Sequence, residues 1–214
     1  MTTLIETATP RRQQKEERRE QILDAAVRIF SDKGFAGASM RDISREVGVT
    51  EGLLYHYFEG KDQLLYSCWK ERSWRASLEK ILAESEGIPL RDVLTAMIRD
   101  FVNTLRSNSD MVRICSNEMQ HNPEMREFHT QRIEDNGNLI GDFLRGRQSL
   151  GEIRSNVDVK APALLLMGSA YSLFMVWGNS SDDDWRQRVE VLLSSGIEVV
   201  MFGISPTEGI GGIV

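Results

Sequence analysis

The segment from Ser39 to Phe58 limits the possible folds of this chain more than any other; it reads SMRDISREVGVTEGLLYHYF. Ser39 is a favourable N-cap, and Asp42 places a carboxylate in the first turn of a predicted helix. Gly48 supplies a turn, after which Thr50 caps a second short helix. Two short helices joined at a glycine are typical of a helix-turn-helix, in which the first helix supports the second and the second enters a DNA major groove.

The apolar spacing agrees with this arrangement. In the first short helix, apolar residues recur at i, i+3 and i+7, namely at Met40, Ile43 and Val47. In the second, Leu54 and Phe58 continue the buried stripe. Upstream, an amphipathic helix ending near Gly34 is predicted from Ile22, Ala25, Ala26, Ile29 and Phe30. Downstream, Gly60 breaks the chain, and Lys61 opens a helix that we expect to run to about Ala83.

With these parts in place, the stretch from Arg19 to Leu65 resembles the TetR (tetracycline-repressor-like) family of transcriptional regulators. The resemblance rests on REQILDAAVRIFSDKGFAGASMRDISREVGVTEGLLYHYFEGKDQLL, about a fifth of the chain. It implies an all-helical homodimer whose N-terminal domains bind a palindromic operator in double-stranded DNA and whose C-terminal domain binds a small-molecule effector. It also implies that the last two long helices pair with those of the partner subunit.

The predicted DNA contacts lie in and beside the two short helices, at Ser39, Arg41, Thr50, Glu51, Gly52, Leu53, Tyr55, His56, Tyr57 and Lys61. Arg41 can pair bidentately with guanine, and Thr50 can touch a phosphate while it caps its helix. Gly52 allows a close approach to DNA. By resemblance, Tyr55 and Tyr57 contact the DNA backbone and Lys61 clamps a phosphate.

Several of these residues also have simpler explanations. Arg41 and His56 can be ordinary surface residues, and Tyr57 can be a packing residue. Glu51 departs from the family, which often carries lysine, glutamine or another polar residue there; a carboxylate repels phosphates but can accept from cytosine N4. Leu53 replaces a frequent threonine or serine, and it can either contact a thymine methyl group or pack inside the protein.

Length and composition favour an all-α protein with two domains, because no run of residues alternates as a hairpin would. We predict a basic, flexible arm over residues 1–18 and a helix-turn-helix DNA-binding domain over 19–65. A larger helical effector-binding and dimerisation domain follows over 66–204, with a flexible tail over 205–214. Pro123 is expected to begin a long helix interrupted at Gly137 and Gly141, and Trp185 to begin the last helix.

The charge is unevenly divided. Residues 1–72 hold twelve Lys or Arg and twelve Asp or Glu, so the net charge of −6 lies in the remainder of the chain. An N-terminal region with no net charge is weak evidence for nucleic-acid binding. The local cluster of Arg11, Arg12, Lys15, Arg18 and Arg19 is more informative, since such an arm can lie along phosphates or in a minor groove.

Sulfur and aromatic side chains of the later helices suit a lipophilic or aromatic effector. The candidates are Met97, Phe101, Met111, Cys115, Met119, Phe128, Met167, Tyr171, Phe174 and Trp177, with Glu118 and His121 as polar anchors. Ordinary core packing is the alternative for each. The apolar stretch over residues 161–177 is short for a bilayer and contains polar residues, so we expect it between the domain core and a second subunit rather than in a membrane.

These features favour a cytoplasmic, ligand-responsive repressor that leaves its operator when the effector binds. Cys68 and Cys115 have no disulfide or metal spacing and are expected to be reduced, buried thiols. Glu118-x-x-His121 has the spacing of di-iron bundles, but no second copy is present. With no P-loop or nucleophile motif, we expect no enzyme, no cofactor and no metal. A structural dimer with a degenerate head is a further alternative.

Overall fold

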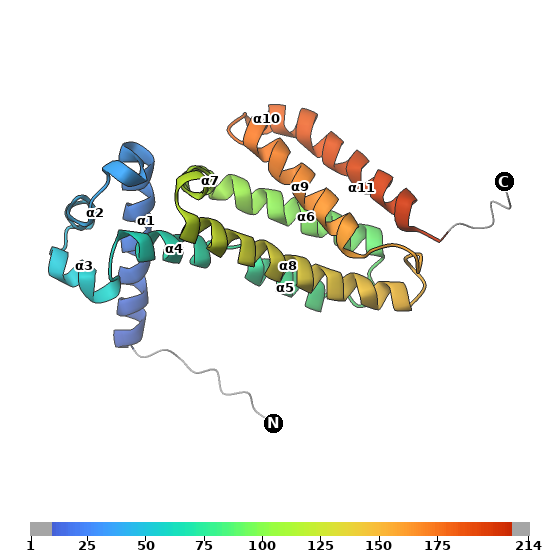
Figure 1. Cartoon of the computed structure of the whole chain (residues 1–214), viewed down its shortest axis with the longest axis horizontal. Coiled ribbons are helices and arrows are strands. Elements are labelled where there is room, and N and C mark those ends of the chain that lie inside the picture. Colours follow the sequence, from blue (N-terminus) through green and yellow to red (C-terminus); the bar gives the residue numbers. More distant parts are fainter. Residues whose placement is uncertain (1–9, 207–214) are drawn as a thin grey trace, which may run out of the picture. The chain divides into compact units, whose positions relative to one another are not determined.

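The computed structural model describes residues 10–206, which contain helices and turns and no strand. This confirms the predicted all-α class. In chain order the helices are α1 (Pro10–Gly37), α2 (Met40–Val47), α3 (Glu51–Tyr57), α4 (Lys61–Glu71), α5 (Arg75–Ala83), α6 (Leu90–Ser107), α7 (Ser109–His121), α8 (Pro123–Ser149), α9 (Lys160–Trp177), α10 (Asp182–Trp185), the π-helical segment η1 (Arg186–Glu190) and α11 (Val191–Ile204). Figure 1 shows their course along the chain.

The described residues divide into two compact units. The first comprises residues 10–72 and 110–125, and the second comprises residues 73–109 and 126–206. Residues 110–125 thus group with the first unit, although they lie in the stretch predicted to form the effector domain. The predicted functional division near residue 66 remains a prediction.

In the first unit, α1 packs against α2 and α4, and α2 packs against α3. Most of the apolar residues predicted to face inward are buried, namely Ile22, Ala25, Ala26, Phe30, Met40, Ile43, Leu54 and Phe58, whereas Ile29 and Val47 are half-buried. Complete burial of a side chain such as Phe30 or Leu54 stabilises the fold by about 1.5–3 kcal/mol relative to exposure. The two short helices are therefore held by a shared core rather than by their own hydrogen bonds.

The first helix differs from the prediction at its start. Residues 10–18, expected to be a flexible arm, are helical, because α1 begins at Pro10. Proline suits a first helical position, and the following Arg, Gln, Lys and Glu residues are good helix formers. Residues 1–9 and 207–214 lie outside the described residues, so the predictions made for them stay predictions. The end of α1 is marked as expected near Gly34, where φ is +71° and the helix is kinked.

The helix expected to run unbroken from Lys61 to about Ala83 is instead two helices. α4 ends at Glu71 and α5 begins at Arg75. Trp74 lies at the break, where its indole N–H donates to Asp100 at 2.8 Å and its ring centroid lies 4.9 Å from that of Phe101. The prediction was wrong because burial of this indole with its N–H satisfied outweighs the few helical hydrogen bonds lost at the break.

In the second unit, α6 packs against α5, α9 and α11, and α9 also packs against α11. The glycines expected to interrupt α8 do not, since Gly137 and Gly141 lie inside one helix. A helical glycine costs about 1 kcal/mol relative to alanine, which packing of a long helix easily offsets. The last helical stretch starts earlier than predicted, at Asp182 rather than at Trp185, and passes through η1 before α11.

Among the described helices, α9 is long and apolar enough to span a membrane by length and composition alone, with a mean hydropathy of 1.2. Its buried residues are Pro162, Ala163, Leu166, Ala170 and Phe174. Only 28% of the segment is buried within the single chain, and four of its large apolar side chains are exposed, at Leu164, Leu165, Met175 and Val176.

Candidate nucleic-acid interface

The start of α2 is held by a reciprocal capping box. The Asp42 backbone N–H donates to Ser39 Oγ at 3.1 Å, and the Ser39 backbone N–H donates to Asp42 Oδ2 at 3.1 Å. The Lys33 ammonium lies 2.6 Å from Asp42 Oδ1 and, with the Ser39 hydroxyl, lowers the pKa of the Asp42 carboxyl to about 2. Ser39 therefore orients the helix that carries Arg41.

The turn between α2 and α3 matches its sequence signals. Gly48 has φ +75° and ψ +34°, a left-handed conformation that favours glycine, and its N–H donates to the carbonyls of Arg45 and Ser44. Thr50 then caps α3, with its Oγ1 accepting from the Leu53 N–H at 3.2 Å. These local bonds fix the direction in which α3 leaves the turn.

The predicted contact residues of α3 share its outward face. Glu51, Gly52, Leu53, Tyr55 and His56 are exposed, whereas Leu54 is fully buried. Leu53 is 39% exposed and Tyr55 51% exposed. Because Leu53 is exposed, it is not a core residue. Tyr57 is half-buried, with its ring against His56 and Phe58, which agrees with the packing alternative for this residue.

Arg41 and Glu51 meet across the turn. Arg41 Nε lies 3.8 Å from Glu51 Oε1, and the two side chains are 73% and 48% exposed. The first turns of α2 and α3 are thereby joined on the outward face of the helix-turn-helix. An exposed ion pair of this length contributes little to stability. It nevertheless places a guanidinium beside a carboxylate on the surface predicted to read DNA.

Lys61 is engaged within the protein. Its ammonium donates to the carbonyls of Phe35 at 2.6 Å and Ala38 at 3.0 Å, with Ala36 at 3.5 Å, and lies 4.5 Å from the centroid of the Phe35 ring. The start of α4 is thus tied to the end of α1. The predicted contact between Lys61 and a phosphate stays a prediction. To make that contact, the ammonium would have to leave these carbonyls or bond to them and to the phosphate at once.

The basic residues before the helix-turn-helix have separate environments. Arg11, Arg12, Lys15 and Arg18 are exposed on the first turns of α1. Arg19 instead forms an ion pair with Glu71 and lies with its Cζ 5.1 Å from the centroid of the Phe58 ring. Four of the five cations are therefore open to solvent, whereas Arg19 also holds the core together.

The predicted effector residues fall in both units. In the first unit, Met111 and Cys115 are buried, Glu118 and Met119 are half-buried, and His121 is exposed. In the second unit, Met97 and Phe174 are buried, while Phe101, Phe128, Met167, Tyr171 and Trp177 are half-buried. Full burial is equally compatible with a core role, and the assignment of these residues to an effector pocket stays a prediction.

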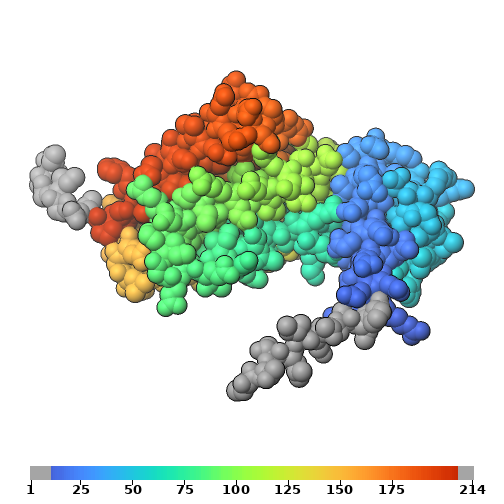
Figure 2. Space-filling view, turned by 180° about the vertical axis from the view of Figure 1, so that it is seen from behind, coloured from blue at the N-terminus to red at the C-terminus, as the bar shows by residue number. Residues whose placement is uncertain are grey.

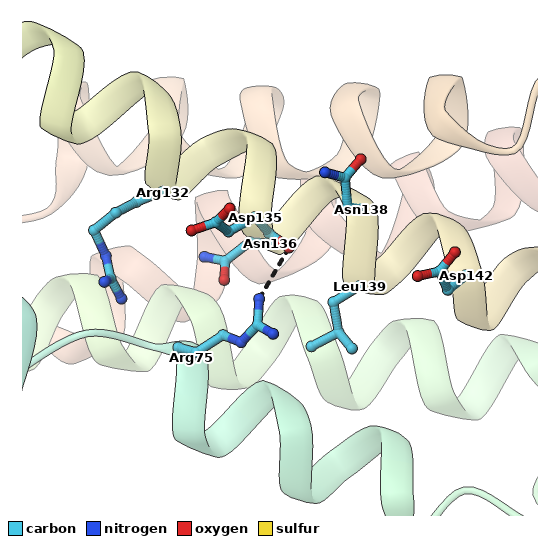
Figure 3. Close-up of a pocket in the computed structure, with 7 residues that line it drawn as sticks. All are labelled: Arg75, Arg132, Asp135, Asn136, Asn138, Leu139 and Asp142. Atoms are coloured by element: carbon cyan, nitrogen blue, oxygen red, sulfur yellow. Dashed lines mark hydrogen bonds between the residues drawn. The ribbon is translucent and has the colours of Figure 1, made fainter.

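A hollow of about 270 Å³ lies in the second unit between α8 and the start of α5 (Figure 3). Its lining residues are Arg75, Arg132, Asp135, Asn136, Asn138, Leu139 and Asp142. The Arg75 guanidinium donates to the Asp135 carbonyl at 2.9 Å across the opening. Arg132, Asn136 and Leu139 follow one another at i, i+4 and i+7 along α8 and point toward α5 in the close-up. These residues are not predicted as a site from the sequence, because polar residues at this spacing are also typical of a solvated helix face.

The two thiols are buried, and burial raises the pKa of Cys68 to about 12 and that of Cys115 further. Such thiols are poor nucleophiles and poor metal ligands. Within residues 10–206, no group of three or more His, Cys, Asp or Glu side chains lies in an arrangement that could hold a metal ion.

The helix-turn-helix residues also match a known family. Residues 22–68 fit the family described as bacterial regulatory proteins, tetR family. The chain belongs to the TetR family. Proteins of this family are transcriptional regulators that bind DNA, and the expectation that the chain is not an enzyme agrees with the relatives below.

Relatives within the TetR family extend over most of the chain. The fatty acid metabolism regulator protein of Bacillus subtilis is 24% identical over 193 residues, which is 89% of this chain and 97% of that protein. The regulator UidR of Escherichia coli is 26% identical over 155 residues, 72% of this chain and 79% of that protein. The transcriptional repressor Rv1474c of Mycobacterium tuberculosis is 27% identical over 142 residues, 65% of this chain and 71% of that protein.

The crystal structure of FadR from Bacillus subtilis, solved in complex with stearoyl-CoA, has the same fold. It superposes with a TM-score of 0.71 and 23% identity over 86% of this chain and 98% of that chain.

Proposed function

We propose that this TetR-family regulator is a repressor that binds a palindromic operator as a homodimer and leaves it when an effector with a lipophilic part binds. The observation that carries the proposal is the exposed face of α3. Leu54 is buried in the core, whereas the other residues from Glu51 to His56 are exposed. A helix held in this way can enter a major groove with its side chains free to meet base edges.

Residues 19–65 are proposed as the DNA-binding domain and 66–204 as the effector-binding and dimerisation domain. The proposed operator contacts are Ser39, Arg41, Thr50, Glu51, Gly52, Leu53, Tyr55, His56, Tyr57 and Lys61. Exposure supports a direct role for Arg41, Tyr55 and His56. The half-buried Tyr57 and the internally bonded Lys61 are better suited to positioning α3 than to reading bases.

The proposed subunit interface is the open apolar surface of α9 and α11. Its exposed members are Leu164, Leu165, Met175 and Val176 on α9 and Val191, Leu192, Val199 and Phe202 on α11. Phe202 is 89% exposed, and Figure 2 shows α11, in red, at the outside of its unit. An apolar patch of this kind is rare on a monomer and common at a subunit interface. A two-fold pair also suits a palindrome.

The proposed effector combines an apolar part with a polar or anionic group. Buried Met97 and Phe174 belong to the apolar core of the second unit, where flexible methionine can adapt to a ligand. The polar hollow beside Arg75 and Arg132 suits the other end of such a molecule. The relative FadR was crystallised with stearoyl-CoA, which has both parts. We therefore propose an amphiphilic acyl compound as the first candidate, in a cytoplasmic protein whose buried thiols suit a reducing compartment.

Release from DNA follows if the effector prefers a conformation in which the two DNA-binding domains of the dimer do not fit the operator. Moving such an equilibrium from 1:99 to 99:1 requires roughly 5.5 kcal/mol of differential binding. An effector that binds both conformations equally cannot act as an inducer, however tightly it binds.

The decisive experiment selects bound fragments from a random duplex library with the full-length protein at fixed salt. We expect an enriched palindrome with half-sites about one helical turn apart. The double variant Arg41→Ala/Tyr55→Ala should lose that enrichment while keeping the fold. Enrichment of no sequence by the wild type, or the same enrichment by the double variant, would contradict the proposal.

Two further measurements test the finer parts. Sedimentation should show a dimer that Val176→Glu dissociates, whereas Ile133→Glu, at an exposed position of α8 (49%), should leave it intact. Stearoyl-CoA, free stearate and coenzyme A should then be compared for release of the selected duplex. Release by coenzyme A alone, or by none of the three, would exclude an acyl effector of this class.

A further inference from the structure

The contact between Arg41 and Glu51 indicates which base pair the helix-turn-helix recognises. This inference rests on the proposed function. The ion pair joins Glu51 Oε1 to Arg41 Nε, the inner nitrogen of the guanidinium, at 3.8 Å. Across the described residues, no side chain or carbonyl accepts a hydrogen bond from the Arg41 guanidinium. Its terminal nitrogens, Nη1 and Nη2, are therefore open on a side chain that is 73% exposed.

A guanidinium that faces a carboxylate through Nε keeps its two terminal nitrogens for a ligand. The two terminal nitrogens match the O6 and N7 acceptors of guanine, which lie side by side in the major groove. The Glu51 carboxylate favours the Arg41 rotamers in which Nε faces it, and these rotamers leave Nη1 and Nη2 unbonded within the protein. The same carboxylate has a second oxygen, which can accept from the N4 amino group of cytosine.

We propose that Arg41 and Glu51 act as one reader of a G·C base pair, with guanine facing Arg41 and cytosine facing Glu51. Arg41 contacts the guanine, and Glu51 both faces Arg41 and accepts from the cytosine of the same pair. Inversion to C·G reverses both contacts: the cytosine amino group then faces the guanidinium, and guanine O6 and N7 face the carboxylate. The reader therefore distinguishes the orientation of the pair as well as its composition.

Glu51 has a second effect on binding. A carboxylate on the DNA-facing surface repels phosphates, so it lowers affinity for any duplex regardless of sequence. In the cognate complex this cost is offset by the cytosine contact. The proposed result is lower non-specific affinity with a higher ratio of specific to non-specific binding.

The chain offers a matched control for this proposal. Glu46 forms a similar exposed ion pair, with Glu46 Oε1 3.1 Å from Nε of Arg28 on α1. Glu46→Gln removes one negative charge from the same short unit without touching Arg41. Glu51→Gln removes the same charge and keeps the side-chain length, which separates a general charge effect from a specific one.

The test begins with the duplex selected by the wild-type full-length protein, followed by affinity measurements on each single base-pair substitution at fixed salt. Wild type should lose roughly five- to 150-fold at one G·C position in each half-site, most strongly for C·G. Glu51→Gln should bind random duplex more tightly and lose most of the penalty against inversion at that position. Arg41→Met removes both terminal nitrogens and should lose the guanine preference, whereas Glu46→Gln should keep the wild-type ranking of base pairs.

Each other outcome has a definite meaning. If Glu51→Gln changes specific and random affinity by the same factor, Glu51 only contributes charge or caps α3, and the paired reader is refuted. The same conclusion follows if the selected half-site contains no G·C pair whose recognition depends on Arg41. If the wild type selects no sequence at all, the proposed function itself fails, which distinguishes the two failures.

Discussion

Lys61 provides the sharpest test of how the DNA-binding unit is held together. Replacement by methionine keeps most of the apolar stem and removes the ammonium that bonds the carbonyls of Phe35 and Ala38. Hydrogen bonds from a charged donor contribute about 1.5–3 kcal/mol each, and the contact with the Phe35 ring adds about 0.5–1 kcal/mol. Because Lys61 is half-buried and water can replace part of these bonds, we expect Lys61→Met to reduce the free energy of unfolding by about 2–4 kcal/mol.

Native-state hydrogen exchange is the best assay, since it reports on the end of α1 and the start of α4 separately from the rest of the chain. Protection of the amides in these segments should fall in Lys61→Met. Lys70→Met is the control, because Lys70 is exposed on the same helix α4. Its protection factors should match those of the wild type.

The competing role for Lys61 makes a different prediction. A lysine that mainly clamps a phosphate would leave protection unchanged when replaced, weaken all duplexes alike and reduce the slope of log affinity against log salt by about one. That combination of results would refute the structural role derived from the three carbonyl contacts.

Three further predictions concern the same unit. The Asp42 pKa of about 2 lies below its ordinary 3.8, so its stabilising contribution is complete above about pH 4 and is lost as pH falls toward 2; urea unfolding of Asp42→Asn should show a flatter pH dependence over that range. Gly52→Ala should stabilise α3 by about 0.5–1 kcal/mol, because a Cβ there meets no atom, and it should weaken DNA binding, because the methyl group hinders close approach to the DNA. A higher melting temperature together with unchanged or tighter DNA binding would contradict this. Cys68 and Cys115 should resist iodoacetamide at pH 8 in the folded protein and react in urea, and rapid labelling of the native chain would show that their burial is incomplete.

Short-range signals allowed the sequence to predict the helix-turn-helix. The Ser39 cap, the left-handed Gly48 and the Thr50 cap each act within four residues, so their effect on the backbone does not depend on the remainder of the chain. The apolar spacing that buried Ile43 and Leu54 is likewise a property of the helix period. These features also carried the family resemblance, which the family match over residues 22–68 confirms.

Contacts between distant residues decided what the sequence left open or predicted wrongly. Trp74 ends the expected continuous helix because its indole finds Asp100, 26 residues away. Lys61 is turned inward by carbonyls 23–26 residues upstream, although the family resemblance suggested a phosphate contact. A helical pattern shows which face of a segment is polar, but it does not show which acceptor a polar group will meet.

The same limit applies to the two sites that carry the new proposals. The sequence supplied Arg41 and Glu51 as separate candidates, and only the angle between α2 and α3 brings Nε and Oε1 within 3.8 Å. The hollow between Arg75 and Arg132 likewise exists because α5 and α8 pass each other in the folded unit. Local backbone preferences are set by neighbouring residues, whereas the meeting of side chains depends on packing that only the tertiary structure determines.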